Sequence, residues 1–427
     1  MNNLYGRLLR ESEIDNIPEA AWRLQGMKED GDYISCNRCS SKHKTKNVKL
    51  PIGSFYCPSC INLGRIRSDE YLYFMEQTLF ESSNVLAWKG KLTELQEKIS
   101  QYLLKAYDSK SDVWVHAVTG AGKTEMIYEL VAKVIKDQGC VGIASPRIDV
   151  CKELYIRMKK DFKIDIALLY GGGDEYFRSP LTILTTHQLL RFKESFDLLI
   201  IDEVDAFPYV GNSMLEYASQ NARKINSSLV LLTATSTKKL ELGVKNKSLI
   251  KLSLARRFHG CPLVVPKNIY LNNIFQMDKL PKKLFKYIQS QRKSGFPLLI
   301  FVPQIKLGQK LAYLLKEKFT SEIIKNVSSL DENRAQIVAD FRAGMINILI
   351  TTTILERGVT FPMVDVFVLG ANHRLFSSSS LVQIAGRVGR NSERTNGLVY
   401  YFHDGKSKAM TKAISEIKKM NKLGGFK

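Results

Sequence analysis

The sequence predicts an α/β fold in which two domains in tandem, each built on a doubly wound parallel sheet, follow a small four-cysteine module. Short apolar runs alternate with helical patterns along most of the chain, which is typical of buried parallel strands joined by helices. Four cysteines occur as two close pairs near the N-terminus. A chain of 427 residues also exceeds what one hydrophobic core usually holds, so more than one domain is expected.

The predicted strands form two groups. Those between residues 85 and 256 are Val113–Ala117, Val141–Ala144, Leu181–Leu184, Leu198–Ile201 and Leu229–Leu232. Those between residues 257 and 427 are Pro297–Val302, Ile346–Ile350, Val364–Leu369 and Gly397–Phe402. Residues 255–276 lack this rhythm, so the domain junction is predicted there. Residues 1–84 form an N-terminal region that ends in a mostly helical connector over 69–84, and a basic helical tail covers 404–427.

The net charge of +21 comes from 63 Lys and Arg against 42 Asp and Glu. It favours a polyanionic partner, either a phosphate backbone or an anionic membrane surface. A generally lysine-rich proteome would give the same charge, so the charge alone does not establish a polyanionic partner. No apolar run is long enough for a membrane span and no secretory signal is visible, so we expect a cytosolic protein with reduced cysteines.

A phosphate-binding loop is predicted at Ala117-Val-Thr-Gly-Ala-Gly-Lys-Thr124, between a strand and a helix. Gly120 and Gly122 allow backbone N–H groups to surround phosphate oxygens. Lys123 would neutralise the β- and γ-phosphates of ATP, and the hydroxyl of Thr124 would bind Mg²⁺. Ala117 stands where this motif usually begins with glycine.

Two carboxylates follow the predicted strand Leu198–Ile201. Acidic residues after a strand are often only a solvated turn, but the upstream phosphate loop favours a catalytic role. Asp202 would then hold Mg²⁺, and Glu203 would orient and deprotonate the attacking water.

Asp202-Glu-Val-Asp205 resembles the DEAD/DEAH box of the superfamily-two helicases, and the other motifs of that family follow in the right order. The resemblance implies two RecA-like domains. It also implies that Gln96 of Thr93-Glu-Leu-Gln96 reads adenine and that motif III, Thr233-Ala-Thr235, couples hydrolysis to domain movement. Gly358 of motif V, Thr351-Thr-Thr-Ile-Leu-Glu-Arg-Gly-Val359, is implied to belong to the nucleotide site. Nucleic-acid contacts are implied for residues of four motifs: Pro146, Arg147, Thr186, His187, Gln304 and Thr352.

Gln383-Ile-Ala-Gly-Arg-Val-Gly-Arg390 resembles motif VI of the same family. Arg387 and Arg390 are spaced to lie on one face of a predicted helix. An arginine brought from a second domain stabilises the charge that spreads over the γ-phosphoryl group, which is worth roughly 10³–10⁵ in rate. The alternative interpretation is an ordinary surface pair of arginines.

Cys36, Cys39, Cys57 and Cys60 have the C-x2-C-x17-C-x2-C spacing of a structural Zn²⁺ site. Four thiolates leave no open coordination position, so no catalysis is assigned to them. Cations and aromatic residues surround the cysteines: Lys42, Lys44, Lys46, Lys49, Arg65, Arg67, Tyr33, Phe55 and Tyr56. They would suit nucleic acid, although the aromatic residues could equally pack the core of the module.

The cysteine module ahead of the motor, together with Thr353-Ile-Leu-Glu-Arg-Gly-Val-Thr-Phe-Pro362, resembles the ComFA family of DNA-uptake ATPases of Gram-positive bacteria. This resemblance implies a translocase that pulls single-stranded DNA through a membrane channel at the inner face of the cell membrane. A phosphoribosyltransferase-like partner and other competence proteins are implied, and a homo-oligomer is compatible with it. The sequence departs from DEAD-box enzymes in two motifs. Many of those enzymes have acids at the positions of Thr353 and Thr360, so the coupling role of those acids cannot be assigned to this chain. Gln383 stands where they have histidine, which favours DNA over RNA as the partner.

Two alternatives stay open. PriA-like replication or repair helicases share these motifs, but their zinc ligands lie within the second domain. A nucleic-acid adaptor that uses ATP only as a switch is the other, and Glu203 argues against it because a pure binder needs no water-activating base.

Overall fold

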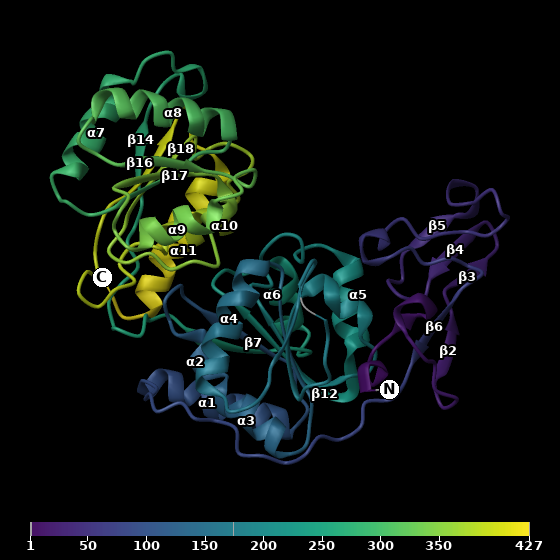
Figure 1. The fold of residues 1–427 in the computed structure, drawn as a ribbon. Helices are drawn as coiled ribbons and strands as arrows, with labels where there is room; N and C mark the ends of the chain where they lie inside the picture. The colour runs from purple at the N-terminus through teal and green to yellow at the C-terminus, as the bar shows by residue number, and fades with distance from the viewer. Residues whose placement is uncertain (1, 174, 427) are drawn as a thin grey trace. The chain divides into compact units, whose positions relative to one another are not determined.

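The computed structural model describes residues 2–173 and 175–426. These form two compact units. One comprises the residues up to His116 together with Lys123–Leu252, and the other comprises Ala117–Gly122 together with the residues from Ser253 onward. Figure 1 shows the fold, coloured from the N-terminus to the C-terminus.

The N-terminal region contains two small antiparallel sheets, in the orders β1-β6-β2 and β3-β4-β5. Their strands are β1 (Leu9–Arg10), β2 (Trp22–Gln25), β3 (Met27–Asp30), β4 (Tyr33–Cys36), β5 (Lys42–Lys44) and β6 (Tyr71–Phe74). Short 3₁₀ helices lie between them: η1 (Asn2–Leu4), η2 (Glu11–Glu13), η3 (Thr45–Asn47) and η4 (Ile61–Leu63).

The prediction of a helical connector over residues 69–84 is wrong, because its first half is strand β6. Tyr71, Tyr73 and Phe74 have high strand propensity, and Leu72 between them is buried beneath the sheet at 1% exposure. Pairing with β1 on one side and β2 on the other supplies the backbone hydrogen-bond partners of this segment, which therefore forms a strand.

The first unit is built around a seven-stranded sheet with the order β13-β7-β12-β11-β8-β10-β9. Strands β7 to β12 pair in parallel. The strands are β7 (Val113–Ala117), β8 (Val141–Ser145), β9 (Ala167–Leu169), β10 (Leu181–Thr185), β11 (Phe196–Asp202), β12 (Arg223–Thr233) and β13 (Ile250–Leu254). The helices are α1 (Glu94–Asp108), α2 (Lys123–Met126), α3 (Tyr128–Lys136), α4 (Ile148–Asp161), η5 (Thr186–Arg191), α5 (Ser213–Ala222) and α6 (Lys238–Lys245).

The second unit contains a six-stranded parallel sheet with the order β14-β19-β18-β15-β17-β16. Its strands are β14 (Lys267–Tyr270), β15 (Leu298–Phe301), β16 (Ile324–Val327), β17 (Ile348–Thr351), β18 (Asp365–Leu369) and β19 (Val399–His403). Its helices are η6 (Ile274–Gln276), α7 (Lys282–Arg292), α8 (Ile305–Lys318), α9 (Arg334–Arg342), η7 (Thr353–Leu355), α10 (Ser378–Ala385) and α11 (Lys408–Leu423). Among the described residues, none of the helices combines the length and the apolar character that crossing a bilayer requires.

Arg7 joins the N-terminal region to the seven-stranded sheet. Its side chain is 7% exposed, and its Cζ atom lies 4.3 Å from the ring centroid of Tyr176 and 5.8 Å from that of Phe192. Burial lowers the pKa of Arg7 to about 10. On either side of it, Leu8 N donates to Arg191 O (2.8 Å) and Lys193 N donates to Gly6 O (3.0 Å). The N-terminal region and the sheet therefore share one core.

Replacing Arg7 with Ala should lower the free energy of unfolding of the first unit by about 2 kcal/mol or more, because a desolvated cation–π contact and its packing are lost. Denaturant titration measures this change. Arg23→Ala is the matched control, since Arg23 lies 5.2 Å from the Tyr71 ring on the exposed surface, where such a contact is worth about 0.5–1 kcal/mol. Equal losses in the two variants would contradict the role given to Arg7.

Candidate functional site

The phosphate loop follows β7 as the sequence predicts. Gly120 and Gly122 have φ angles of 78° and 71°, in the left-handed region that glycine enters readily. Lys123 is the first residue of α2 and Thr124 is the second. Both side chains therefore stem from the end of a helix where backbone N–H groups favour an anion.

The carboxylates are at the same edge of the seven-stranded sheet. Strand β12 pairs with both β7 and β11, so the end of β11 lies two strands from the phosphate loop. Asp202 is the last residue of β11, and its Oδ1 accepts a hydrogen bond from Glu203 N (2.9 Å). Glu203 has a φ of 59°, which is uncommon for a residue other than glycine and which occurs preferentially at functional sites.

The segment after β12 is hydrogen-bonded to the acidic motif. Thr235 Oγ1 donates to Asp205 Oδ2 (2.5 Å), and both residues are buried. Thr233 Oγ1 accepts from Thr235 N (3.0 Å), which closes the turn that presents Thr235. The last acid of the Asp202–Asp205 motif thus holds motif III. The sequence interpretation did not identify this contact, although it had singled out both segments.

The predicted nucleic-acid residues of the first domain follow two paired strands. Thr185 and Ser145, the last residues of β10 and β8, are register partners. Arg147 caps α4 directly after β8, beside the buried Pro146, while Thr186 and His187 begin η5 after β10. Burial lowers the pKa of His187, so its ring is neutral near pH 7. The structure thus brings these four residues to the edge that also carries Asp202.

Gln96 is 5% exposed and forms the capping box of α1. Its Oε1 accepts a hydrogen bond from Thr93 N (2.8 Å), and Thr93 Oγ1 accepts one from Gln96 N (3.4 Å). The amide oxygen therefore helps to start the helix. Recognition of adenine by Gln96 stays a prediction.

The second domain repeats the arrangement at the end of its parallel strands. Phe301 and Thr351, the last residues of β15 and β17, are register partners. Gln304 caps α8 after β15 and is exposed, whereas Thr352 caps η7 after β17 and is half-buried. Gly358 follows within motif V with a φ of 74°.

Arg387 and Arg390 do not lie on a helix, so that prediction is wrong. Helix α10 ends at Ala385, with Gly386 as its C-cap, and Gly389 has a φ of 70° in the turn that follows. Arg387 is 1% exposed, and its Nη1 donates to Val359 O of motif V. Arg390 Nε donates to Gly386 O (2.9 Å).

A run of serines connects motif V to motif VI. Ser377 caps α10, and its Oγ accepts from Ser380 N (3.0 Å). Ser379 Oγ accepts from Arg357 Nη2 (2.8 Å), and Ser380 Oγ donates to Glu356 Oε2. The sequence interpretation missed these contacts. The signal that could have found the helix start is a serine cap directly ahead of an apolar run.

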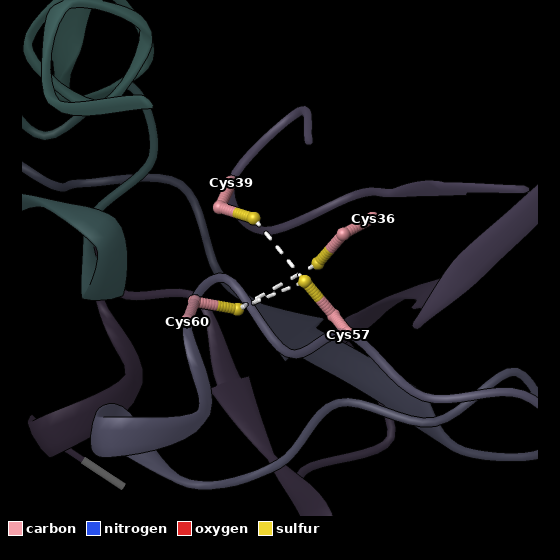
Figure 2. Close-up of side chains that lie close together, drawn as sticks. All are labelled: Cys36, Cys39, Cys57 and Cys60. Atoms are coloured by element: carbon pink, nitrogen blue, oxygen red, sulfur yellow. Dashed lines mark hydrogen bonds between the residues drawn. The ribbon is translucent and has the colours of Figure 1, made fainter. Parts of the chain in front are cut away.

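The four cysteines of the N-terminal region converge, and Figure 2 shows their sulfur atoms pointing toward one another. The ligand atoms all lie within 4.8 Å of one another, with Sγ–Sγ distances of 3.8 Å for Cys36–Cys60, 3.6 Å for Cys39–Cys57 and 3.7 Å for Cys57–Cys60. A tetrahedron with metal–sulfur bonds of about 2.3 Å has edges of about 3.8 Å, so the cluster fits a four-thiolate zinc site.

A buried arginine supports the second cysteine knuckle. Arg38 is 1% exposed and donates to three backbone oxygens, Cys60 O (2.7 Å), Leu63 O (3.1 Å) and Gly64 O (2.5 Å). His43 Nε2 lies 3.6 Å from Cys57 Sγ. Phe55 and Tyr56 pack against the core of this region and are only half-buried, so the structure uses them for packing at least in part.

Known proteins resemble this chain over nearly its whole length. Competence protein ComFA of Streptococcus pneumoniae is 52% identical over 425 residues, which cover 99% of this chain and 98% of the relative. The chain belongs to the ComFA family. The ComFA protein of Bacillus subtilis is 41% identical over 91% of this chain and 86% of its own length. The DEAD/DEAH box helicase family matches residues 93–242, and the helicase conserved C-terminal domain matches residues 278–392.

Solved helicases share the fold of this ComFA-family chain. Helicase Lhr of Mycobacterium smegmatis, solved with single-stranded DNA and AMP-PNP, has a TM-score of 0.58 and 16% identity, and covers 79% of this chain and 51% of its own. Dbp5 of S. cerevisiae, solved with RNA and ADP BeF3, has a TM-score of 0.56 and 18% identity, and covers 77% of this chain and 88% of its own. The two parallel sheets are RecA-like, and the chain is a nucleic-acid-dependent ATPase of the helicase class associated with competence.

Thr235→Val should lower the free energy of unfolding by about 1–3 kcal/mol, because the variant removes a buried hydrogen bond to the Asp205 carboxylate. Denaturant titration of the whole protein measures this loss of unfolding free energy. Ser228→Ala is the control, since the hydroxyl of Ser228, on the strand that precedes Thr235, is buried and has no hydrogen-bond partner in the part of the chain that the structure describes. A smaller loss for Thr235→Val than for the control would contradict the assignment.

Proposed function

We propose that this chain is an ATP-driven translocase that pulls single-stranded DNA into the cell during bacterial competence. The observation that carries the proposal is the placement of its motifs. In both RecA-like sheets, the residues assigned to ATP or to nucleic acid lie at or just after the carboxyl ends of strands that pair in parallel. Membership of the ComFA family supports the competence role.

In the proposed hydrolysis, Lys123 neutralises the β- and γ-phosphates while the backbone at Gly120 and Gly122 surrounds them. Thr124 and Asp202 would hold Mg²⁺, which neutralises phosphate charge when it is bound with ATP. Glu203 orients the attacking water and accepts its proton. The left-handed backbone of Glu203 gives this carboxylate a direction set by the chain rather than by a flexible turn.

Arg387 and Arg390 belong to the second domain, whereas Asp202 and Glu203 belong to the first. In the proposed mechanism the two arginines stabilise the charge on the γ-phosphoryl group, so the transition state forms only when the domains close. The strand contacts proposed for Arg147 and His187 in the first domain and for Gln304 and Thr352 in the second then move relative to one another. Each cycle of closure and opening would advance the strand.

The four-cysteine cluster is proposed as a structural zinc site. All four thiols are buried, and four thiolates fill a tetrahedral shell, so no coordination position is left for a substrate. Its exposed neighbours Lys42, Lys44 and Lys46 could add phosphate contacts beside the motor.

The proposed place of action is the inner face of the cell membrane, where DNA leaves the uptake channel. The proposed partners are that channel and a phosphoribosyltransferase-like competence protein, and we propose that copies of the chain assemble into an oligomer. The surplus of 21 positive charges supports work beside polyanions and anionic lipid.

ATP turnover and displacement of streptavidin from end-biotinylated strands test the translocase directly. We expect single-stranded DNA to stimulate turnover more than duplex DNA or RNA, and streptavidin to be displaced from one end of the strand only. Glu203→Gln should lower turnover about 10²–10⁴-fold, because the general base is lost, and should abolish displacement.

Both Glu203→Gln and Lys123→Ala should still bind single-stranded DNA, since their side chains are assigned to ATP alone. Retained turnover in Lys123→Ala would remove the phosphate-loop assignment. ATP turnover that does not change when polynucleotide is added would contradict the proposed translocation, as would turnover without displacement of streptavidin.

Metal analysis of the purified protein should find a single zinc ion per chain, and Cys57→Ala should remove it and lower the melting temperature. Zinc binding contributes about 10–16 kcal/mol of apparent free energy in small zinc modules, so the loss of a ligand is severe. Cys261→Ala is the control, because this half-buried thiol lies outside the cluster. A Cys57→Ala protein with a full complement of zinc would refute the site.

A further inference from the structure

The segment that connects the two domains in sequence contains a buried arginine to which the proposed hydrolysis gives no role. Arg257 follows β13, the last strand of the first sheet, by three residues and is 2% exposed. Its neighbours Arg256 and Phe258 are exposed. A charged side chain is buried only where specific partners compensate the loss of water. Burial lowers the pKa of Arg257, and the nearby Arg390 lowers it further.

The partners of Arg257 are the carbonyl groups of the turn that carries the motif VI arginines. Its Nη1 donates to Val388 O (2.8 Å) and to Gly389 O, and its Nη2 donates to Gly386 O (3.3 Å). Three carbonyl groups of one four-residue turn, 386–389, therefore share one guanidinium. The turn directly follows helix α10, and a cation at the carboxyl end of a helix is electrostatically favourable.

His259 adds a second contact from the same segment. Its Nδ1 accepts a hydrogen bond from Cys261 N (3.2 Å), which leaves the proton on Nε2, and Nε2 lies 2.9 Å from Gly389 O as a donor. Gly389 is also tightly enclosed, since a Cβ atom there would lie 2.3 Å from Thr395 O. The turn is thus held from both the connecting segment and its own domain.

Arg257 and Arg390 are bonded to the same oxygen. Gly386 O accepts from Arg390 Nε (2.9 Å) as well as from Arg257 Nη2. The position of the Arg390 side chain therefore depends on an oxygen that Arg257 fixes. A lysine could not replace this contact, because a single ammonium cannot span carbonyl groups that the planar fork of a guanidinium reaches together.

We propose that Arg257 is a positioning residue for ATP hydrolysis, which holds the motif VI turn so that Arg387 and Arg390 meet the γ-phosphoryl group in one geometry. The inference rests on the role proposed above for those two arginines. Arg257 itself touches no substrate in this proposal and acts through the turn. Since it stands in the connecting segment, the path of that segment and the position of the arginines are set together.

The test uses steady-state ATP turnover of the full-length protein with saturating single-stranded DNA. Arg257→Ala should lower kcat about 10–100-fold, because a small misplacement of a catalytic group is costly, while KM for ATP changes less than about threefold. Arg257→Lys should recover only part of the rate. Arg256→Ala is the matched control, since Arg256 donates to Gly424 O (2.6 Å) instead of to the motif VI turn, and its kcat should stay within about twofold of the native value.

A double-mutant cycle separates positioning from mere stability. Arg390→Ala alone should be slow, and adding Arg257→Ala to it should lower kcat by a smaller factor than Arg257→Ala does in the native protein, because part of the effect of Arg257 acts through Arg390. Losses that multiply would overturn the inference, as would a native kcat in Arg257→Ala, even with a lowered melting temperature. Should Arg257→Ala fail to fold, Arg257→Lys carries the same cycle.

The outcomes also separate this inference from the proposed function. A slow Arg390→Ala together with a native rate in both Arg257 variants would overturn the positioning role alone. A native rate in both Arg387→Ala and Arg390→Ala would overturn the assignment of motif VI, and the positioning role with it.

Discussion

Parallel strands bring all of their carboxyl ends to one edge of a sheet, and both RecA-like sheets of this chain depend on that constraint. In the first sheet, the strands that lead to the phosphate loop, the acidic motif and motif III are neighbours. Their last residues, Ala117, Asp202 and Thr233, lie far apart in sequence. Helices return the chain to the opposite edge, so each new helix begins beside the motif residues. Anionic ligands are therefore met by helix N-termini as well as by side chains.

The inner strands of both sheets could be predicted from the sequence, and the outermost strands could not. All nine predicted strands occur, and the strands that were missed are β9, β13, β14 and β16. These four are the outermost strands of the two sheets. An inner strand of a parallel sheet is covered on both faces and appears as a continuous apolar run, whereas an edge strand such as Lys267–Tyr270 is short, polar and largely exposed.

The motif residues were also predictable, because the spacing within each motif is local, but their mutual contacts were not. The hydrogen bond from Thr235 to Asp205 and the contacts of Ser379 and Ser380 with motif V join segments that only the fold brings together. The count of basic residues was misleading as well, because the sequence does not show which of their side chains the fold buries. Arg7, Arg38 and Arg257 count toward a basic surface in the sequence, yet all three are buried and bind aromatic rings or backbone oxygens.

These internal contacts join the two parts of the second domain to which the proposed mechanism assigns ATP and the DNA strand. Thr352, the proposed strand contact, lies in motif V, and Glu356 and Arg357 in the same motif are hydrogen-bonded to the first turn of α10. At the other end of α10, Arg387 returns to motif V through Val359 O. In the proposed mechanism, a displacement of motif VI on loss of the γ-phosphate would therefore move motif V with it or break buried hydrogen bonds, which are costly to leave unmade. The hydrogen bonds between these two motifs are thus the contacts through which the proposed mechanism couples ATP to the strand.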